Sequence, residues 1–157
     1  KNTSVKFRVD VAMMCKMGFD IGLKDLNADE LTFCQEAVAT YHRLKPIILN
    51  GDFYRLVSPY DTEHMAVMHV GDNQKKAILY AYDIHPRFAE STYAVQLQGL
   101  DPDKMYKIEE INLMPDTESK AVINGQTYSG DYLMKVGVRV FSARQTTSHI
   151  FEITALD

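Results

Sequence analysis

Between positions 27 and 45, apolar side chains recur at intervals of three and four residues, and this spacing predicts an amphipathic helix. Asn27 and Glu30 have the spacing of a capping box at its start. Pro46 has no backbone N–H to donate, so we expect the helix to end before it. The predicted apolar face consists of Leu31, Cys34, Val38, Tyr41 and Leu44.

The segment before this helix carries a weaker pattern. Residues 17–26 are short and contain glycine at two places, which fits a strand around Phe19 to Ile21 that leads into a loop. For residues 5–14 the sequence does not decide between strand and helix. Phe7, Val9 and Val11 alternate with other residues there, but a helix also fits Val5, Val9, Ala12 and Met13.

Beyond Pro46 the chain changes to short runs in which apolar residues alternate with others. Val136, Val138 and Val140 are an example, and this period of two is typical of antiparallel strands with one buried face. Strands are predicted at residues 64–70, 75–84, 92–100, 105–111, 132–141 and 148–156. Six or more strands in about 100 residues indicate an antiparallel β-sandwich or barrel.

Composition and charge narrow the possible partners. The chain has 157 residues with 46% hydrophobic and 24% charged, as in globular proteins. Its net charge of −4 argues against a nucleic-acid partner. No apolar run approaches the roughly 20 residues of a membrane helix, so we expect no membrane partner. The chain begins without Met, which favours a piece of a longer polypeptide over a processed small protein.

Few residue types suggest a reactive site. His64 and His69 should lie on opposite faces of one strand, because their separation is odd. Cys15 and Cys34 lack metal-binding or redox spacing, and we expect free, buried thiols. No local pattern marks a nucleophile beside an oriented base. The sequence therefore predicts no metal and no cofactor.

Asp20 is the carboxylate whose context points to a ligand. It lies in the stretch Gly-Phe-Asp-Ile-Gly, at the end of the strand predicted there. If that strand belongs to a (β/α)8 barrel, its C-terminal end faces the active site. Asp20 is then a candidate substrate-binding residue; the alternative is a loop-capping or solvated carboxylate.

Four stretches share an order with one known family. GDFYRLVSP (51–59) follows a helix end of Leu-Lys-Pro-Ile-Ile, AMMCKMGFDIGL (12–23) precedes that helix, and LQGLDPDKMYKI (97–108) and YSGDYLMKVGV (128–138) come later. In this order they resemble glycoside hydrolase family 36, the microbial α-galactosidases. The resemblance spans about residues 5 to 155 and rests on the number of motifs, since none is decisive alone.

The resemblance implies a division of the chain at its boundary stretch. Residues 1–50 would be the last strand and helix of a catalytic (β/α)8 barrel, and residues 51–157 a C-terminal β-sandwich. The parent enzyme would hydrolyse terminal α-galactosides of oligosaccharides with retention. Its two catalytic aspartates would lie upstream, so no catalytic residue is expected here and the chain alone would be structural. Asp20 stands where the family usually has Glu.

Other interpretations remain open. A carbohydrate-binding or interaction β-sandwich without enzymatic role fits the back part, although the absence of Trp counts against sugar binding. A truncated barrel would leave the apolar face of the 27–45 helix and the strand edge near Phe19 uncovered. We therefore expect self-association through residues 1–45, as a two-fold dimer.

Overall fold

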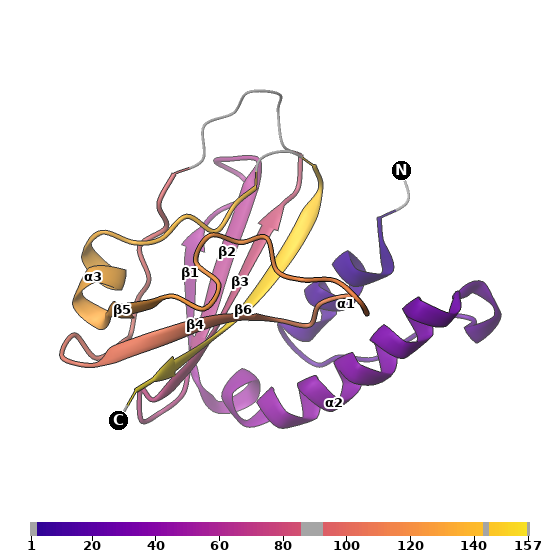
Figure 1. Ribbon diagram of the computed structural model, residues 1–157, viewed down its shortest axis with the longest axis horizontal. Coiled ribbons are helices and arrows are strands. Elements are labelled where there is room, and N and C mark those ends of the chain that lie inside the picture. The colour runs from indigo at the N-terminus through magenta and orange to yellow at the C-terminus, as the bar shows by residue number, and fades with distance from the viewer. Residues whose placement is uncertain (1–2, 86–92, 143–144, 157) are drawn as a thin grey trace.

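A six-stranded antiparallel sheet forms the centre of the molecule, with the order β1-β2-β3-β6-β4-β5 (Figure 1). The computed structural model describes residues 3–85, 93–142 and 145–156. The strands are β1 (Asp52–Val57), β2 (His64–Val70), β3 (Lys76–Asp83), β4 (Met105–Ile111), β5 (Thr127–Ser129) and β6 (Thr147–Ala155). The helices are α1 (Val5–Met13), α2 (Ala28–Asn50) and α3 (Gly130–Lys135), with a 3-10 turn at Leu23–Asp25.

The helices α1 and α2 cover one face of the sheet, whereas α3 lies on the other side (Figure 1). Along α2 the buried side chains follow intervals of three and four residues, and on α1 the interval is four. They pack on alternate residues of β2, β3 and β6. The helix side of this core consists of Val5, Val9, Met13, Phe33, Cys34, Ala37, Tyr41, Leu44 and Ile48, and the sheet side of Val67, Ile78, Tyr80, Tyr82 and Ile150.

The opposite face of the sheet is covered by α3 and by extended segments around it. Leu133 of α3 and Leu97 and Val140 of the extended segments pack on inward residues of the strands, which include Met68, Leu79 and Tyr106. A single antiparallel bridge, between Val95 and Val138, links two of the segments. The molecule is thus three layers deep.

The prediction of antiparallel strands is confirmed, but the prediction of two packed sheets is wrong for the described residues. All six named strands belong to one sheet, and the second layer is built from α3 and extended chain. The runs at 64–70, 75–84, 105–111 and 148–156 became β2, β3, β4 and β6. Residues 93–100 carry only the bridge at Val95, and residue 92 lies outside the described part. The run 132–141 begins as α3 instead of a strand.

At the front of the chain one open alternative is settled and two expectations are corrected. Residues 5–13 form a helix, which settles the open alternative. Phe19 to Ile21 form no strand; they are extended chain without ladder bonds. The capping box at Asn27 is confirmed, but α2 runs through Pro46 to Asn50, because the sheet beneath holds Leu44 and Ile48 in place on either side of it.

Candidate functional site

The carbonyl groups at the end of α1 are bound by side chains from the sheet. The Tyr82 hydroxyl donates to the Asp10 carbonyl over 2.8 Å, and the Tyr80 hydroxyl to that of Met13 over 3.3 Å. The last four carbonyls of a helix have no partner within it, so these bonds fix where α1 ends. They also fix where the segment after α1 leaves the sheet.

That segment folds back over α1 and encloses a hollow of about 170 Å³ that contains Asp20. Its wall from α1 includes Arg8, and the returning chain contributes Phe19, which is 42% exposed. The hollow is lined by Arg8, Val9, Ala12, Met17, Gly18, Phe19, Asp20 and Ile21. A guanidinium, a carboxylate and an aromatic ring on one small surface offer donors, acceptors and an apolar face together. Such a set suits a polyhydroxylated ligand.

Sequence reasoning selected Asp20 but missed Arg8. Arg8 lies on α1, and its side chain reaches the hollow only because the chain turns back after Met17. Arg8 lies on a helix and Asp20 lies in chain without regular secondary structure, so no single helical or strand period relates them and no local pattern could have paired them.

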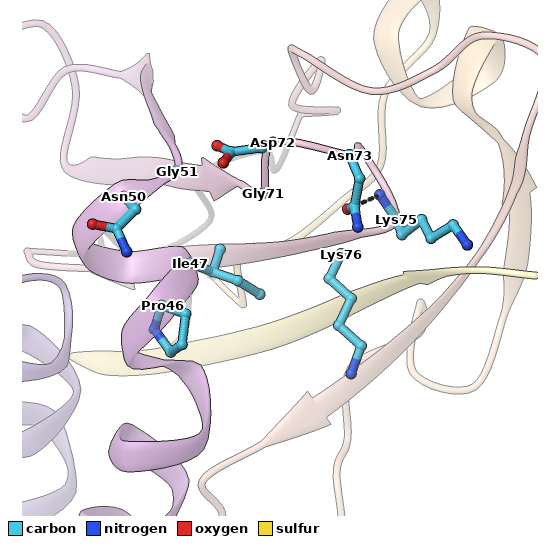
Figure 2. Close-up of a pocket in the computed structure, with 9 residues that line it drawn as sticks. All are labelled: Pro46, Ile47, Asn50, Gly51, Gly71, Asp72, Asn73, Lys75 and Lys76. Atoms are coloured by element: carbon cyan, nitrogen blue, oxygen red, sulfur yellow. Dashed lines mark hydrogen bonds between the residues drawn. The ribbon is translucent and has the colours of Figure 1, made fainter.

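A second, larger hollow of about 430 Å³ lies between the end of α2 and the β2–β3 turn (Figure 2). Gly51 forms part of its wall, and a Cβ there would come within 2.5 Å of the Val70 carbonyl oxygen. Close approach of two backbones, and not a positive φ, therefore requires glycine. Asp72 is the carboxylate of this hollow, and the side chains of Lys75 and Lys76 point away from it. Lys76 instead lies 3.4 Å from Glu152.

Asp10 lies at a buried polar junction between α1 and the sheet. Its carboxylate accepts hydrogen bonds from Lys6 at 2.5 Å, Ser148 at 2.6 Å and Asn112 at 2.6 Å. Both oxygens of this fully buried group are therefore engaged. The junction attaches α1 to β6 and to the end of β4.

A second junction holds the loop after β4. Glu110 accepts hydrogen bonds from Ser119 and lies 2.6 Å from Nδ1 of His149. Burial alone would raise the pKa of the Glu110 carboxyl, but the bonds from His149 and Ser119 outweigh it and lower that pKa. His64 and Asp83 form a further buried pair, 2.8 Å apart. These acids are occupied by structural partners.

Within the described ranges, no three His, Cys, Asp or Glu side chains are placed to hold one metal ion. Both cysteines are free; Cys34 is buried as expected, and burial raises the pKa of its thiol, but Cys15 is exposed. His64 and His69 do face opposite sides of β2, as predicted: His64 contacts Phe141 and His69 contacts the end of α1. None of the helices described is long and apolar enough to cross a bilayer.

Comparison with known proteins identifies relatives along most of the chain. Probable alpha-galactosidase C of Aspergillus terreus is 33% identical over 136 residues, which are 86% of this chain and 16% of that protein. Alpha-galactosidase 1 of Pediococcus pentosaceus is 28% identical over 137 residues, 87% of this chain and 17% of its own length. The chain thus spans about a sixth of these relatives.

Solved structures agree with the sequence relatives. The crystal structure of the GH36 α-galactosidase AgaB from Geobacillus stearothermophilus superposes with a TM-score of 0.84 at 25% identity, over 99% of this chain and 20% of that one. The α-galactosidase of Lactobacillus brevis gives 0.82 at 26% identity, over 100% of this chain and 21% of its own. Residues 64–153 match the glycosyl hydrolase family 36 C-terminal domain. Since that match covers more than half of the chain, this protein belongs to glycoside hydrolase family 36 and contains the family's C-terminal domain.

Proposed function

We propose that this chain is the C-terminal part of a retaining α-galactosidase that cleaves terminal α-galactosides from oligosaccharides. In this proposal the chain alone is structural and the reaction takes place elsewhere in the enzyme. The relatives are α-galactosidases, and the chain corresponds to 16–17% of the sequence relatives cited. The remaining five sixths or so of such an enzyme leave ample length for a catalytic domain.

The distribution of carboxylates is the observation that carries the non-catalytic role. A retaining glycosidase needs two carboxyl groups about 5 Å apart on either side of the scissile bond. Each of the two hollows is lined by one carboxylate, Asp20 in the smaller and Asp72 in the larger. The buried acids Asp10 and Glu110 are held by hydrogen bonds within the fold.

We further propose that residues 1–50 are the C-terminal end of a catalytic barrel, and the outer surface of α2 supports this by offering apolar side chains that the rest of the barrel would cover. Leu31, Val38 and Leu49 are 36%, 36% and 43% exposed, and their separations of seven and eleven residues place them on one line of the helix. This line is turned away from the sheet-facing side of α2. Like the exposed Phe19 and the hollow lined by Asp20, this line of side chains belongs to residues 1–50.

The direct test is to incubate the isolated chain with 4-nitrophenyl α-galactoside and follow nitrophenol release. We expect no turnover above buffer, and turnover by material free of host enzyme would overturn the proposal. A glycan array on the same protein tests the alternative binding-module function. Micromolar binding to a defined glycan would favour that alternative over a structural role.

Asp20 is proposed to contact substrate in the parent enzyme. There, Asp20→Asn is expected to raise KM for an α-galactoside while kcat changes little, because a group that binds substrate and transition state alike affects KM. Asp72→Asn in the other hollow is the matched control. Equal kinetic constants for wild type and D20N would contradict a substrate contact.

A further inference from the structure

His69 forms a hydrogen bond with the backbone just after α1, where residues 14–22, the segment that contains Asp20, begin. Its Nε2 lies 3.0 Å from the carbonyl oxygen of Met14. A carbonyl oxygen only accepts, so Nε2 carries the proton in this contact. The ring is 5% exposed, with Phe53 tilted against it at a centroid distance of 4.9 Å and Tyr80 edge-on at 5.8 Å.

The other ring nitrogen has no partner. Nδ1 of His69 is buried and forms no hydrogen bond with any described residue. In the neutral ring this atom is an acceptor, and leaving it unpaired is tolerable. A second proton would turn it into a charged, buried donor without an acceptor, which is strongly unfavourable. Burial accordingly lowers the pKa of the His69 imidazole, although the bond to Met14 acts in the opposite direction.

The segment after Met14 has few backbone hydrogen bonds, although the Met17 side chain packs against the helix-side core. Cys15 donates to the Ala12 carbonyl, and the next backbone bond is from Asp25 to Gly22. Within the part of the chain that the structure describes, residues 16–21 make no backbone hydrogen bond. A stretch with so few bonds is the kind that opens locally while the core stays folded.

We propose that His69 is a proton-operated latch: uptake of a second proton on Nδ1 releases residues 14–22 from the sheet and opens the hollow that contains Arg8 and Asp20. Release exposes the ring edge to water, which solvates the new N–H. The latch links the protonation state of one buried histidine to the shape of a surface hollow. It does not depend on the function proposed above.

Other ionisable groups lie on the elements packed against β2 but do not explain such a response. The neighbouring elements contribute Arg55 on β1, Tyr80 and Tyr82 on β3, Asp10 and Cys15 at the end of α1, and Cys34 and Tyr41 on α2. Burial raises the pKa of both β3 tyrosines and of the Cys34 thiol, so these stay neutral in mild acid. Asp10 is held by Lys6 and Ser148.

The test measures local mobility of the full 157-residue chain at pH 7.5 and pH 5.0 by backbone NMR relaxation, with the His69 ring titrated in the same samples. We expect the order parameters of residues 15–22 to fall from about 0.85 to below about 0.6 as His69 takes up its proton. The open fraction should rise up to about tenfold for each pH unit between the imidazole pKa of the open segment and the lower pKa of the closed one. Unchanged order parameters after His69 has titrated would overturn the latch.

Variants separate His69 from the other histidines. His69→Gln keeps an amide donor for the Met14 carbonyl but cannot titrate, so residues 15–22 should stay ordered at pH 5.0. His42→Gln removes an exposed histidine of α2 and should behave as wild type. Acid-induced mobility that persists in H69Q would refute the proposal. If H69Q does not fold, the wild-type titration decides: loosening of the sheet together with residues 15–22 indicates general acid unfolding and contradicts a latch.

Discussion

Glu110 shows how a single buried acid can hold a loop. Its carboxylate joins His149 on β6 to Ser119 in the loop after β4, and its side chain is 2% exposed. Glu109, its neighbour, points to the solvent side and pairs with Lys107 at 2.7 Å, with its own side chain 54% exposed. The two adjacent glutamates therefore form a matched pair.

Glu110→Gln is expected to lower the free energy of unfolding by about 1–3 kcal/mol at pH 7, because an amide cannot accept both bonds as a carboxylate does. Glu109→Gln should change it by less than about 0.5 kcal/mol. Chemical denaturation of both variants checks this. Equal losses of unfolding free energy in the two variants would mean that the hydrogen bonds of Glu110 add nothing specific to stability.

The same residue predicts a pH dependence. The pKa of Glu110 is lower in the folded than in the unfolded chain. Its contribution is therefore present above the unfolded pKa of about 4.3 and is lost as pH falls through the lower, folded value. The stability difference between wild type and E110Q should shrink below about pH 4.5. A difference independent of pH from 7 to 3 would refute this assignment.

Gly130 permits a close approach of two backbones at the start of α3. A Cβ there would lie 2.0 Å from the Asp101 carbonyl oxygen, whereas at Gly18 it would meet nothing within 4 Å. Gly130→Ala is expected to cost at least about 1–3 kcal/mol of unfolding free energy. Gly18→Ala should be nearly neutral. Thermal unfolding of the pair tests this, and a stable G130A would show that the loop at Asp101 can yield.

At the scale of elements, the attachment of α2 to the sheet can be tested by comparing a buried and an exposed leucine of the same helix. Leu44 is 1% exposed and lies against the sheet, whereas Leu49 is 43% exposed on the outer line. Leu44→Ala is expected to cost about 2–5 kcal/mol and Leu49→Ala much less. Similar losses, measured by denaturation, would contradict the placement of α2.

The elements also show what can be derived from sequence. The four long strands were predictable as short β-rich runs separated by turn signals. The expectation of one buried face is wrong for β2 and β3, which are covered on both faces and therefore read as near-continuous apolar runs. The sequence carries signals for both ends of α3: Ser129 is its N-cap, and Gly137 follows its end with φ +82°. The alternating valines at 136, 138 and 140 nevertheless favoured a strand prediction for this segment. Local sequence could not predict the helix at Pro46, because packing on the sheet decides it. Nor could it predict the conformation of Phe19 to Ile21, which depends on the return of the chain over Arg8.

For the whole molecule, self-association through residues 1–45 stays a prediction. The apolar surface available for it is smaller than the sequence suggested. Cys34, Tyr41 and Leu44 are covered by the chain's own sheet, which leaves the outer line of α2 for a partner. We expect concentration-dependent dimers in light scattering that Val38→Lys abolishes. A monodisperse 17.9 kDa monomer at every concentration would contradict it.

The position of β6 has a consequence for biosynthesis. This strand is synthesised after the other five described strands, yet it lies between β3 and β4 and pairs with both. As the polypeptide emerges from the ribosome, α2 and the first four strands are already outside, but their two halves of the sheet have no strand to join them. Their apolar faces must wait in contact with water or a chaperone until residues 147–155 arrive. A chain truncated before Thr147 would therefore be unable to close its sheet.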